Sequence, residues 1–197
     1  MGLNHQLPTG ATPLDGDELE GLIPAHLTSR HQLNEWEQQN IASALLWLAK
    51  QRKHRPLDEP WLRRLHREMF GKTWRWAGTY RKSDKSIGTD WRQIRTQLPS
   101  LLGDISYQLQ HQVSSHDQIA IGFHHRLVVI HPFPNGNGRH ARLMADVLIE
   151  QLGRPRFSWG GNSSLVEATS LRSTYISALQ QADRGDLKAL IAFARAG

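Results

Sequence analysis

The chain of 197 residues contains no cysteine, which excludes disulfide bonds, thiolate catalysis and cysteine-ligated zinc. Its length suits one domain with a core large enough to fold without such staples. The net charge of +6 and the pI of about 10.1 favour anionic partners such as nucleotides or nucleic acid, although scattered charges are equally typical of a solvated surface.

The first 27 residues are rich in glycine, proline and polar groups, and they are predicted to form an arm that packs on the surface. They lack the charged and then apolar pattern of a secretory signal. No apolar run in the chain reaches the roughly 20 residues needed to cross a membrane. We therefore expect a cytoplasmic protein without membrane contact, in which residues 28–197 form one domain.

Two helices are predicted in the first part of this domain. One spans residues 28–51, with Thr28 or Ser29 as its cap. Its apolar stripe is predicted to be Leu33, Trp36, Ile41, Ala44, Leu45 and Leu48. The other spans about 60–70, where Pro60 suits the first turn. The aromatic side chains that follow it are expected in the core.

Further elements are predicted along the rest of the chain. Residues 80–95 carry turn residues and alternation without a helical period, which is typical of a surface hairpin. Helices follow at 98–112, with Pro99 near the start, and at 118–130, which is apolar on almost all sides and therefore central. The last helices are predicted at about 137–153, 163–182 and 186–195.

A glycine-rich loop joins the predicted central helix to the next one, within the stretch HPFPNGNGRHAR at residues 131–142. Pro132 disfavours the helical conformation for His131, so the central helix should end just before it. Gly136 and Gly138 let the backbone approach a ligand closely. The first N–H groups of the following helix have no intrahelical partner, and with the helix dipole they favour phosphate.

Two arginines strengthen this phosphate site. Arg139 and Arg142 lie three residues apart, on one face of the helix that starts at about Asn137. Both are permanently charged planar donors that suit phosphate oxygens. His131 lies at the other end of the same short loop and supplies a titratable base. The stretch therefore predicts a polyphosphate cradle with a base at its rim.

These residues resemble the motif of the Fic (filamentation induced by cAMP) family, His-x-Phe-x-Asp/Glu-Gly-Asn-Gly-Arg-x-x-Arg, and only the acidic position departs, as Asn135. The segment LHREMFGKTWRWAGTYR at residues 65–81 also resembles the Fic core, and the resemblance covers about residues 57–195. It implies an all-α, Fic-type helical bundle with a small β-hairpin flap. Within the family, the chain is most similar to the group called mobile mystery protein B.

The resemblance implies transfer of AMP from ATP to a Ser, Thr or Tyr hydroxyl of a target protein. His131 would be the general base, since a histidine with an ordinary pKa of about 6.5 is largely neutral near pH 7. The nucleotide would be bound by Gly136, Asn137, Gly138, Arg139 and Arg142. The backbone amides would hold the α- and β-phosphates, with a side-chain hydrogen bond from Asn137. Arg139 would bind the β-phosphate and Arg142 the γ-phosphate.

Asn135 stands where the acidic residue of the family ligates Mg²⁺. Its neutral carbonyl oxygen can ligate Mg²⁺, but more weakly than a carboxylate. Three alternatives follow: AMP transfer with lowered metal affinity, use of another nucleotide or phosphate donor, or a toxin component that binds nucleotide with little transferase activity. A phosphotransferase branch of the superfamily also has asparagine here but lacks the Gly-Asn-Gly run, so AMP transfer is favoured.

The flap of the family holds the backbone of the target beside the histidine by strand addition. The resemblance assigns this docking role, against the alternative of an ordinary surface hairpin, to Lys82, Ser83, Asp84, Lys85, Ser86, Ile87 and Gly88.

Many Fic proteins also carry an inhibitory helix, Ser/Thr-x-x-x-Glu-Gly/Asn, whose glutamate pairs with the second arginine of the motif. The chain contains no clean match to this pattern. Glu35 or Glu37 on the predicted 28–51 helix are the candidates, although helix carboxylates are more often solvated. An external antitoxin, such as a helix–turn–helix companion protein, is the alternative partner.

The competing class is a DNA-binding module, which the basic charge would suit. Such a module needs a short helix–turn–helix with an exposed polar recognition helix. The helix after the glycines is too apolar from Leu143 onward. Nucleic acid is therefore not the expected partner.

Overall fold

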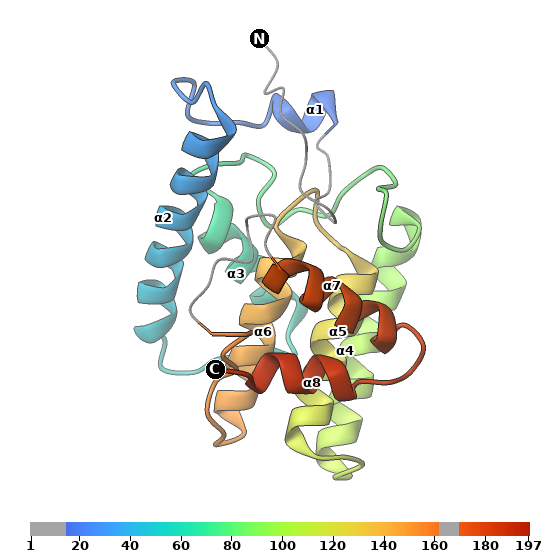
Figure 1. Ribbon diagram of the computed structural model, residues 1–197. Helices are drawn as coiled ribbons and strands as arrows, with labels where there is room; N and C mark the ends of the chain where they lie inside the picture. The colour runs from blue at the N-terminus through green and yellow to red at the C-terminus, as the bar shows by residue number, and fades with distance from the viewer. Residues whose placement is uncertain (1–14, 162–169) are drawn as a thin grey trace.

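The computed structural model describes residues 15–161 and 170–197, and within these ranges it consists of helices and loops without a sheet (Figure 1). This confirms the all-α class. A short 3-10 turn, η1 (Trp91–Gln93), precedes the fourth helix. The helices are α1 (Gly16–Leu19), α2 (Arg30–Ala49), α3 (Glu59–Phe70), α4 (Ile94–Gln110), α5 (His116–Ile130), α6 (Asn137–Gln151), α7 (Ser170–Ala182) and α8 (Lys188–Arg195).

The core is centred on α5 and α6, which run in opposite directions on either side of the loop at 131–136 and pack more extensively together than any other pair (Figure 1). α4 and α8 pack on α5, α3 packs on α6, and α2 packs on α3. Residues Ile121, Phe123 and Leu127 of α5 all lie in the core. The glycine-rich loop therefore closes the central helical hairpin.

The helices begin where the sequence offers capping groups. The Ser29 hydroxyl accepts a hydrogen bond from the Gln32 amide at 3.2 Å, and the Gln32 side chain accepts one from the Ser29 amide at 3.1 Å. Ser115 and Gln118 repeat this capping box at the start of α5. Each box satisfies N–H groups that the first turn of a helix leaves unpaired.

The helix predicted to start near Pro99 begins earlier, at Ile94, and Pro99 lies within α4. Asp90 explains the early start, because its side chain accepts from the Arg92 amide at 2.8 Å and caps the η1 turn that leads into α4. Pro99 removes one helical hydrogen bond, to the carbonyl of Arg95. Both residues are exposed, so the missing bond lies on the surface side of the helix.

The inward face of α2 differs from the predicted apolar stripe. Its buried residues are Leu33, Glu37, Asn40, Ala44 and Leu48. Leu45 is 39% exposed, so the prediction for this residue is wrong. The buried positions recur every three or four residues, as on one helical face, but two of them are polar. Asn40 contacts the Thr73 hydroxyl at 3.2 Å, and Glu37 contacts Trp74.

The segment predicted as a β-hairpin flap forms no β-ladder, and residues 82–88 consist of bends and irregular backbone. The buried guanidinium of Arg81 takes the place of strand pairing. It donates to the carbonyl of Ser83 at 2.8 Å and to that of Thr89, so one side chain ties both ends of the segment. Gly88 has a φ of +113°, which favours glycine. The flap is therefore an irregular loop.

The N-terminal arm is described from residue 15 onward. α1 lies toward the same end of the molecule as the 131–136 loop (Figure 1), and an isolated bridge between Leu22 and Trp74 anchors the chain behind it. The predicted arm residues 1–14 and the predicted helical residues 163–169 lie outside the described residues. Within the described ranges, no helix has the length and apolar character needed to cross a membrane.

Candidate active site

His131 directly follows α5 and adopts a left-handed conformation, with a φ of +52° and a ψ of +60°. This conformation is uncommon for a residue other than glycine, and it turns the chain out of the helix. Nδ1 of the ring lies 3.3 Å from the carbonyl oxygen of Val128. Because a carbonyl only accepts hydrogen bonds, the ring proton lies on Nδ1 and the lone pair of Nε2 is the basic position.

The surroundings of His131 keep its ring neutral. Burial, assisted by the charges of Arg81 and Lys85, lowers the pKa of His131 to about 4. The flap loop covers the residue closely, since a Cβ on Gly88 would lie 2.7 Å from the Cβ of His131. The Nε of Arg81 also donates to the His131 carbonyl at 2.7 Å. The structure thus places the expected base, in its neutral form, against the expected docking loop.

The side chain of Asn137 holds the glycine-rich loop together. Its Oδ1 accepts from the Phe133 amide at 2.9 Å, and its Nδ2 donates to the Phe133 carbonyl at 2.7 Å. The residue is only 3% exposed. The structure therefore gives Asn137 a role inside the loop, and the expected side-chain bond to the nucleotide stays a prediction.

His66 of α3 supports the same loop, although the sequence motifs assigned it no role. Its Nε2 donates to the Asn135 carbonyl at 3.0 Å, and its Nδ1 accepts from the Gly78 amide at 3.0 Å. Its ring stacks on that of Phe133, with the centroids 3.7 Å apart. Both hydrogen bonds need a neutral ring, and burial holds the pKa of His66 well below its ordinary value.

The two glycines of the cradle have different roles. Gly136 makes the turn into α6 with a φ of +77°, and a Cβ there would lie 2.6 Å from the ring of Phe70. The protein itself therefore requires this glycine. At Gly138, the nearest atom to an added Cβ would be Nη1 of Arg142, at 3.9 Å. The missing side chain leaves room beside the guanidinium, which fits a phosphate group.

Arg139 forms an ion pair with the buried carboxylate of Glu37 on α2, with Nη1 and Oε2 2.6 Å apart. The other oxygen of Glu37 accepts from Nε1 of Trp74 at 2.6 Å, and Phe70 packs on the guanidinium. Glu37 therefore contacts the first arginine of the motif, whereas the inhibitory glutamate of the family pairs with the second arginine. Glu35 keeps a largely exposed side chain. The sequence signal for Glu37 is weak, because the residue lies at helical spacing from Leu33, Ala44 and Leu48 but is itself polar.

Arg142 extends toward α7. Its guanidinium carbon lies 5.4 Å from the centre of the Tyr175 ring. Arg172, also on α7, lies nearby, and burial followed by the charge of Arg142 lowers the pKa of Arg172. This side of the cradle is cationic, which suits the outer phosphates of a nucleotide.

Asn135 turns its side chain onto its own loop, where Oδ1 accepts from the Gly136 amide at 2.6 Å. In the part of the chain that the structure describes, no group of three or more acidic, histidine or cysteine side chains could hold a metal ion. Mg²⁺ prefers carboxylates, phosphate oxygens and water. At this position the described structure offers the neutral side-chain oxygen of Asn135, which already accepts a hydrogen bond, and this does not make a magnesium site by itself.

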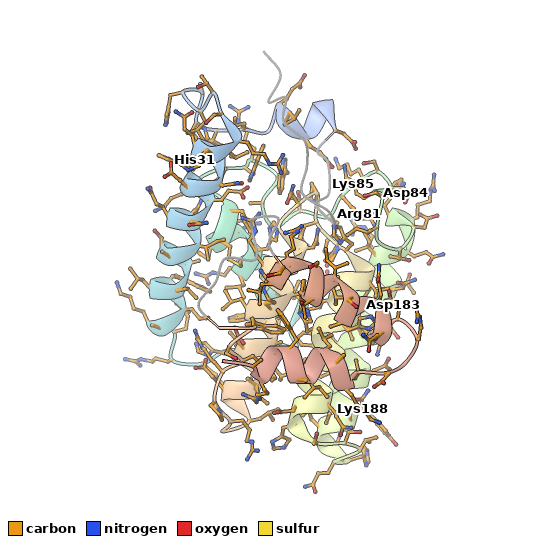
Figure 2. The ribbon with its side chains drawn as sticks, viewed as in Figure 1. His31, Arg81, Asp84, Lys85, Asp183 and Lys188 are labelled. Atoms are coloured by element: carbon orange, nitrogen blue, oxygen red, sulfur yellow. The ribbon has the colours of Figure 1, made fainter. Side chains whose placement is uncertain are left out.

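The flap loop is fixed at its middle by the N-terminal segment. The Nζ of Lys85 lies 2.7 Å from the carboxylate of Asp15 and 2.6 Å from that of Glu18, and the Lys85 side chain is almost fully buried. The hydrogen bond from Lys85 lowers the pKa of Asp15. Figure 2 shows Lys85 close to Arg81, on the side of the molecule that carries α1. Two cationic side chains thus set the position of the loop.

Residues 56–149 match the model of the Fic/DOC family. The protein adenylyltransferase Fic of Nematostella vectensis is 36% identical over 70 residues, which are 36% of this chain and 14% of that protein. The protein adenylyltransferase fic-1 of Caenorhabditis elegans is 31% identical over 70 residues, which are 12% of its length. The match therefore spans a small part of these relatives.

Solved structures share the fold. The N-terminal Fic domain of a Bartonella effector protein (Bep) from Bartonella sp. AR 15-3 aligns with a TM-score of 0.69 at 16% identity, over 91% of each chain. A fragment of Fic-1 from C. elegans aligns with a TM-score of 0.64 at 22% identity, over 90% of this chain and 51% of that one. BepC from Bartonella tribocorum, solved with bound AMPPNP, aligns with a TM-score of 0.63 at 18% identity, over 92% and 97%. The expected Fic-type fold is confirmed.

Gly136→Ala is expected to destabilise the protein by about 2–4 kcal/mol, because the left-handed conformation and the contact with Phe70 both oppose a Cβ. Gly153→Ala is the matched control, since Gly153 has a φ of +73° but nothing lies within 4 Å of an added Cβ. It should lose only the conformational part, about 1–2 kcal/mol. Urea unfolding measures both, and equal losses would contradict a steric role for Phe70.

Proposed function

We propose that this chain, whose residues 56–149 form a Fic/DOC family domain, transfers AMP from ATP to a Ser, Thr or Tyr hydroxyl of a target protein. The observation that carries the proposal is the neutral base His131, which lies one short loop away from the start of α6 and its two arginines. The curated relatives are named protein adenylyltransferases, which supports the same reaction.

His131 acts as the general base. Its Nε2 takes the proton of the target hydroxyl while the hydroxyl oxygen attacks the α-phosphorus. The bond from the α-phosphorus to the bridging oxygen of the β-phosphate breaks, AMP stays on the target, and pyrophosphate leaves. The contact between Nδ1 and Val128 fixes the ring so that Nε2 is the acceptor. The lowered pKa keeps the base unprotonated before the reaction.

The start of α6 stabilises the negative charge of the reacting phosphates. Its first amides have no intrahelical partner, and they point toward the loop, where they hold the α- and β-phosphates. Asn137 contributes its amide, while its side chain keeps the loop in shape. Arg139 binds the β-phosphate and Arg142 the γ-phosphate, so both neutralise the departing pyrophosphate.

Mg²⁺ bound with the nucleotide would be held mainly by phosphate oxygens and water, with Asn135 as a weak further ligand, and would supply positive charge at the phosphates. No step above depends on the metal. The neutral oxygen of Asn135 supports a second candidate function, in which the same site uses another nucleotide or phosphate donor.

Residues 82–88 dock the target beside His131. Arg81 and Lys85 hold the loop in place, and its bends leave the backbone outside any ladder in the described structure. An extended segment of the target can therefore pair with this backbone by strand addition. This places the target hydroxyl near Nε2 of the base.

Glu37 restrains the site from within the chain. Its carboxylate and a phosphate group compete for the same guanidinium, because both form charge-assisted hydrogen bonds with Arg139. The family resemblance also suggests an antitoxin, in the form of a helix–turn–helix companion protein. Such a partner would lower nucleotide binding further, in addition to the competition that Glu37 already exerts within the protein.

Glu37→Gln is expected to raise the affinity for ATP up to about tenfold, because it removes the competing charge while the amide still accepts from Trp74. Glu35→Gln is the matched control on the same helix, and its exposed side chain should leave the affinity unchanged. Calorimetric titration measures both variants. A lower ATP affinity in Glu37→Gln would mean that the carboxylate orients Arg139 for the phosphate instead of competing with it.

Asn135→Asp is expected to lower the Mg²⁺ concentration needed for half-maximal activity and to raise the activity, because a carboxylate is the stronger ligand. The new oxygen can still accept from the Gly136 amide, so the loop should keep its shape. A magnesium titration of the transfer reaction measures the change. A fall in activity at every magnesium concentration would show that the asparagine serves another purpose.

Labelling of a cell lysate with ATP labelled on the α- or the γ-phosphate tests the proposed reaction. The wild type should label a protein with the α-label only, and His131→Ala should lower this transfer by about 100-fold or more while ATP still binds. A band from the γ-label alone would establish phosphate transfer instead. An unchanged α-label in His131→Ala would remove His131 from the role of base.

A further inference from the structure

The two motif arginines have partners of different charge. Arg139 pairs with the carboxylate of Glu37, whereas Arg142 contacts the neutral phenol of Tyr175 and forms no ion pair with the described residues. A carboxylate neutralises a guanidinium and competes with phosphate for it. A phenol orients the guanidinium but leaves its full charge for a ligand.

Tyr175 of α7 holds Arg142 against the start of α6. The tyrosine is buried, and its ring centre lies 5.4 Å from the guanidinium carbon of Arg142, a distance at which a cation is attracted to the face of an aromatic ring. At the same time, Nη1 of Arg142 lies 3.9 Å from the place of an added Cβ on Gly138. One side chain thus fixes the guanidinium beside the space that the glycine leaves open.

The hydroxyl of Tyr175 is held by His124 of α5. The phenolic oxygen lies 3.0 Å from Nε2 of His124, which is within hydrogen-bond distance. This bond fixes the ring of Tyr175 in the plane from which it contacts the guanidinium of Arg142.

His124 is itself fixed in the core. Burial lowers the pKa of His124 to about 3, so the ring stays neutral near pH 7 and can accept the phenolic proton. Its ring packs on Trp159, with the centroids 4.7 Å apart. Trp159 is anchored in turn, because its Nε1 donates to Asp146 at 3.0 Å. The phenol therefore has one defined position between α5 and α6.

We propose that Tyr175 is a positioning residue that orients Arg142 toward the γ-phosphate and so sets the preference for ATP over ADP. This inference rests on the proposed function for the contact between Arg142 and the γ-phosphate. A long arginine side chain loses rotamer freedom when it binds a ligand, and this loss weakens binding. Tyr175 orders the guanidinium in advance, so ATP binds without that loss.

Calorimetric titration of ATP and of ADP into the wild type, Tyr175→Phe and Arg142→Ala tests the proposal. Phenylalanine keeps the ring but removes the hydroxyl that His124 holds, so the ring loses its fixed position against Arg142, and Tyr175→Phe should weaken ATP about 5–10-fold and leave ADP within about twofold. Arg142→Ala should show the same selectivity with a larger loss. Tyr80→Phe is the matched control, because it removes a half-buried phenolic hydroxyl that donates to Glu59 at 2.6 Å. It should change neither affinity.

Substitutions of His124 separate hydrogen bonding from packing. His124→Gln keeps an acceptor for the phenolic proton and should bind ATP like the wild type, whereas His124→Leu should resemble Tyr175→Phe. Equal ATP affinities of the two His124 variants would overturn the proposal. Unchanged ATP affinity in Tyr175→Phe, or equal losses of ATP and ADP, would overturn it as well.

The outcomes also distinguish this inference from the proposed function. A wild type whose preference for ATP depends on Tyr175, but which transfers no AMP to protein, would support the positioning role and overturn AMP transfer. A wild type that transfers AMP, with an ATP preference unchanged by Tyr175→Phe, would support AMP transfer and overturn the positioning role.

Discussion

The loop at residues 131–136 carries backbone N–H and C=O groups into the protein interior, and buried backbone groups need hydrogen-bond partners. Its short, proline- and glycine-containing backbone forms neither helix nor strand, so side chains from outside the loop supply several of these partners. They are Asn137, His66 and Arg81. The helical bundle is therefore built around a loop whose shape is fixed before any ligand binds.

This constraint shapes the charges around the start of α6. The loop buries His131 and keeps it neutral, which a base requires. The arginines are held from opposite sides, Arg139 by Glu37 on α2 and Arg142 by Tyr175 on α7. The carboxylate of Glu37 weakens the attraction of Arg139 for phosphate, while the phenol of Tyr175 leaves the attraction of Arg142 for phosphate intact. The site thus contains Arg139, whose charge is partly neutralised by a carboxylate, and Arg142, whose full charge is left for a ligand.

The sequence predicts the helices and the motif well, because hydrophobic periodicity, capping residues and glycine positions are local signals. It fails where a polar residue takes part in packing. Glu37 reads as a solvated carboxylate until its position on the buried face of α2 is known. The loop role of Asn137 is not visible in the sequence either, because its side chain bonds the Phe133 backbone only in the folded loop. The flap reads as a hairpin because the pattern cannot reveal that the guanidinium of Arg81 replaces strand pairing.

Amide hydrogen exchange at Phe133 and Gly136, in the protein without nucleotide, tests the preformed cradle most directly. Both amides donate to asparagine side chains, at 2.9 Å and 2.6 Å. A preformed cradle predicts exchange as slow as in the interior of α6, with loss of protection at Phe133 in Asn137→Ala. Rapid exchange of both amides in the wild type, slowed only after ATP is added, would contradict it.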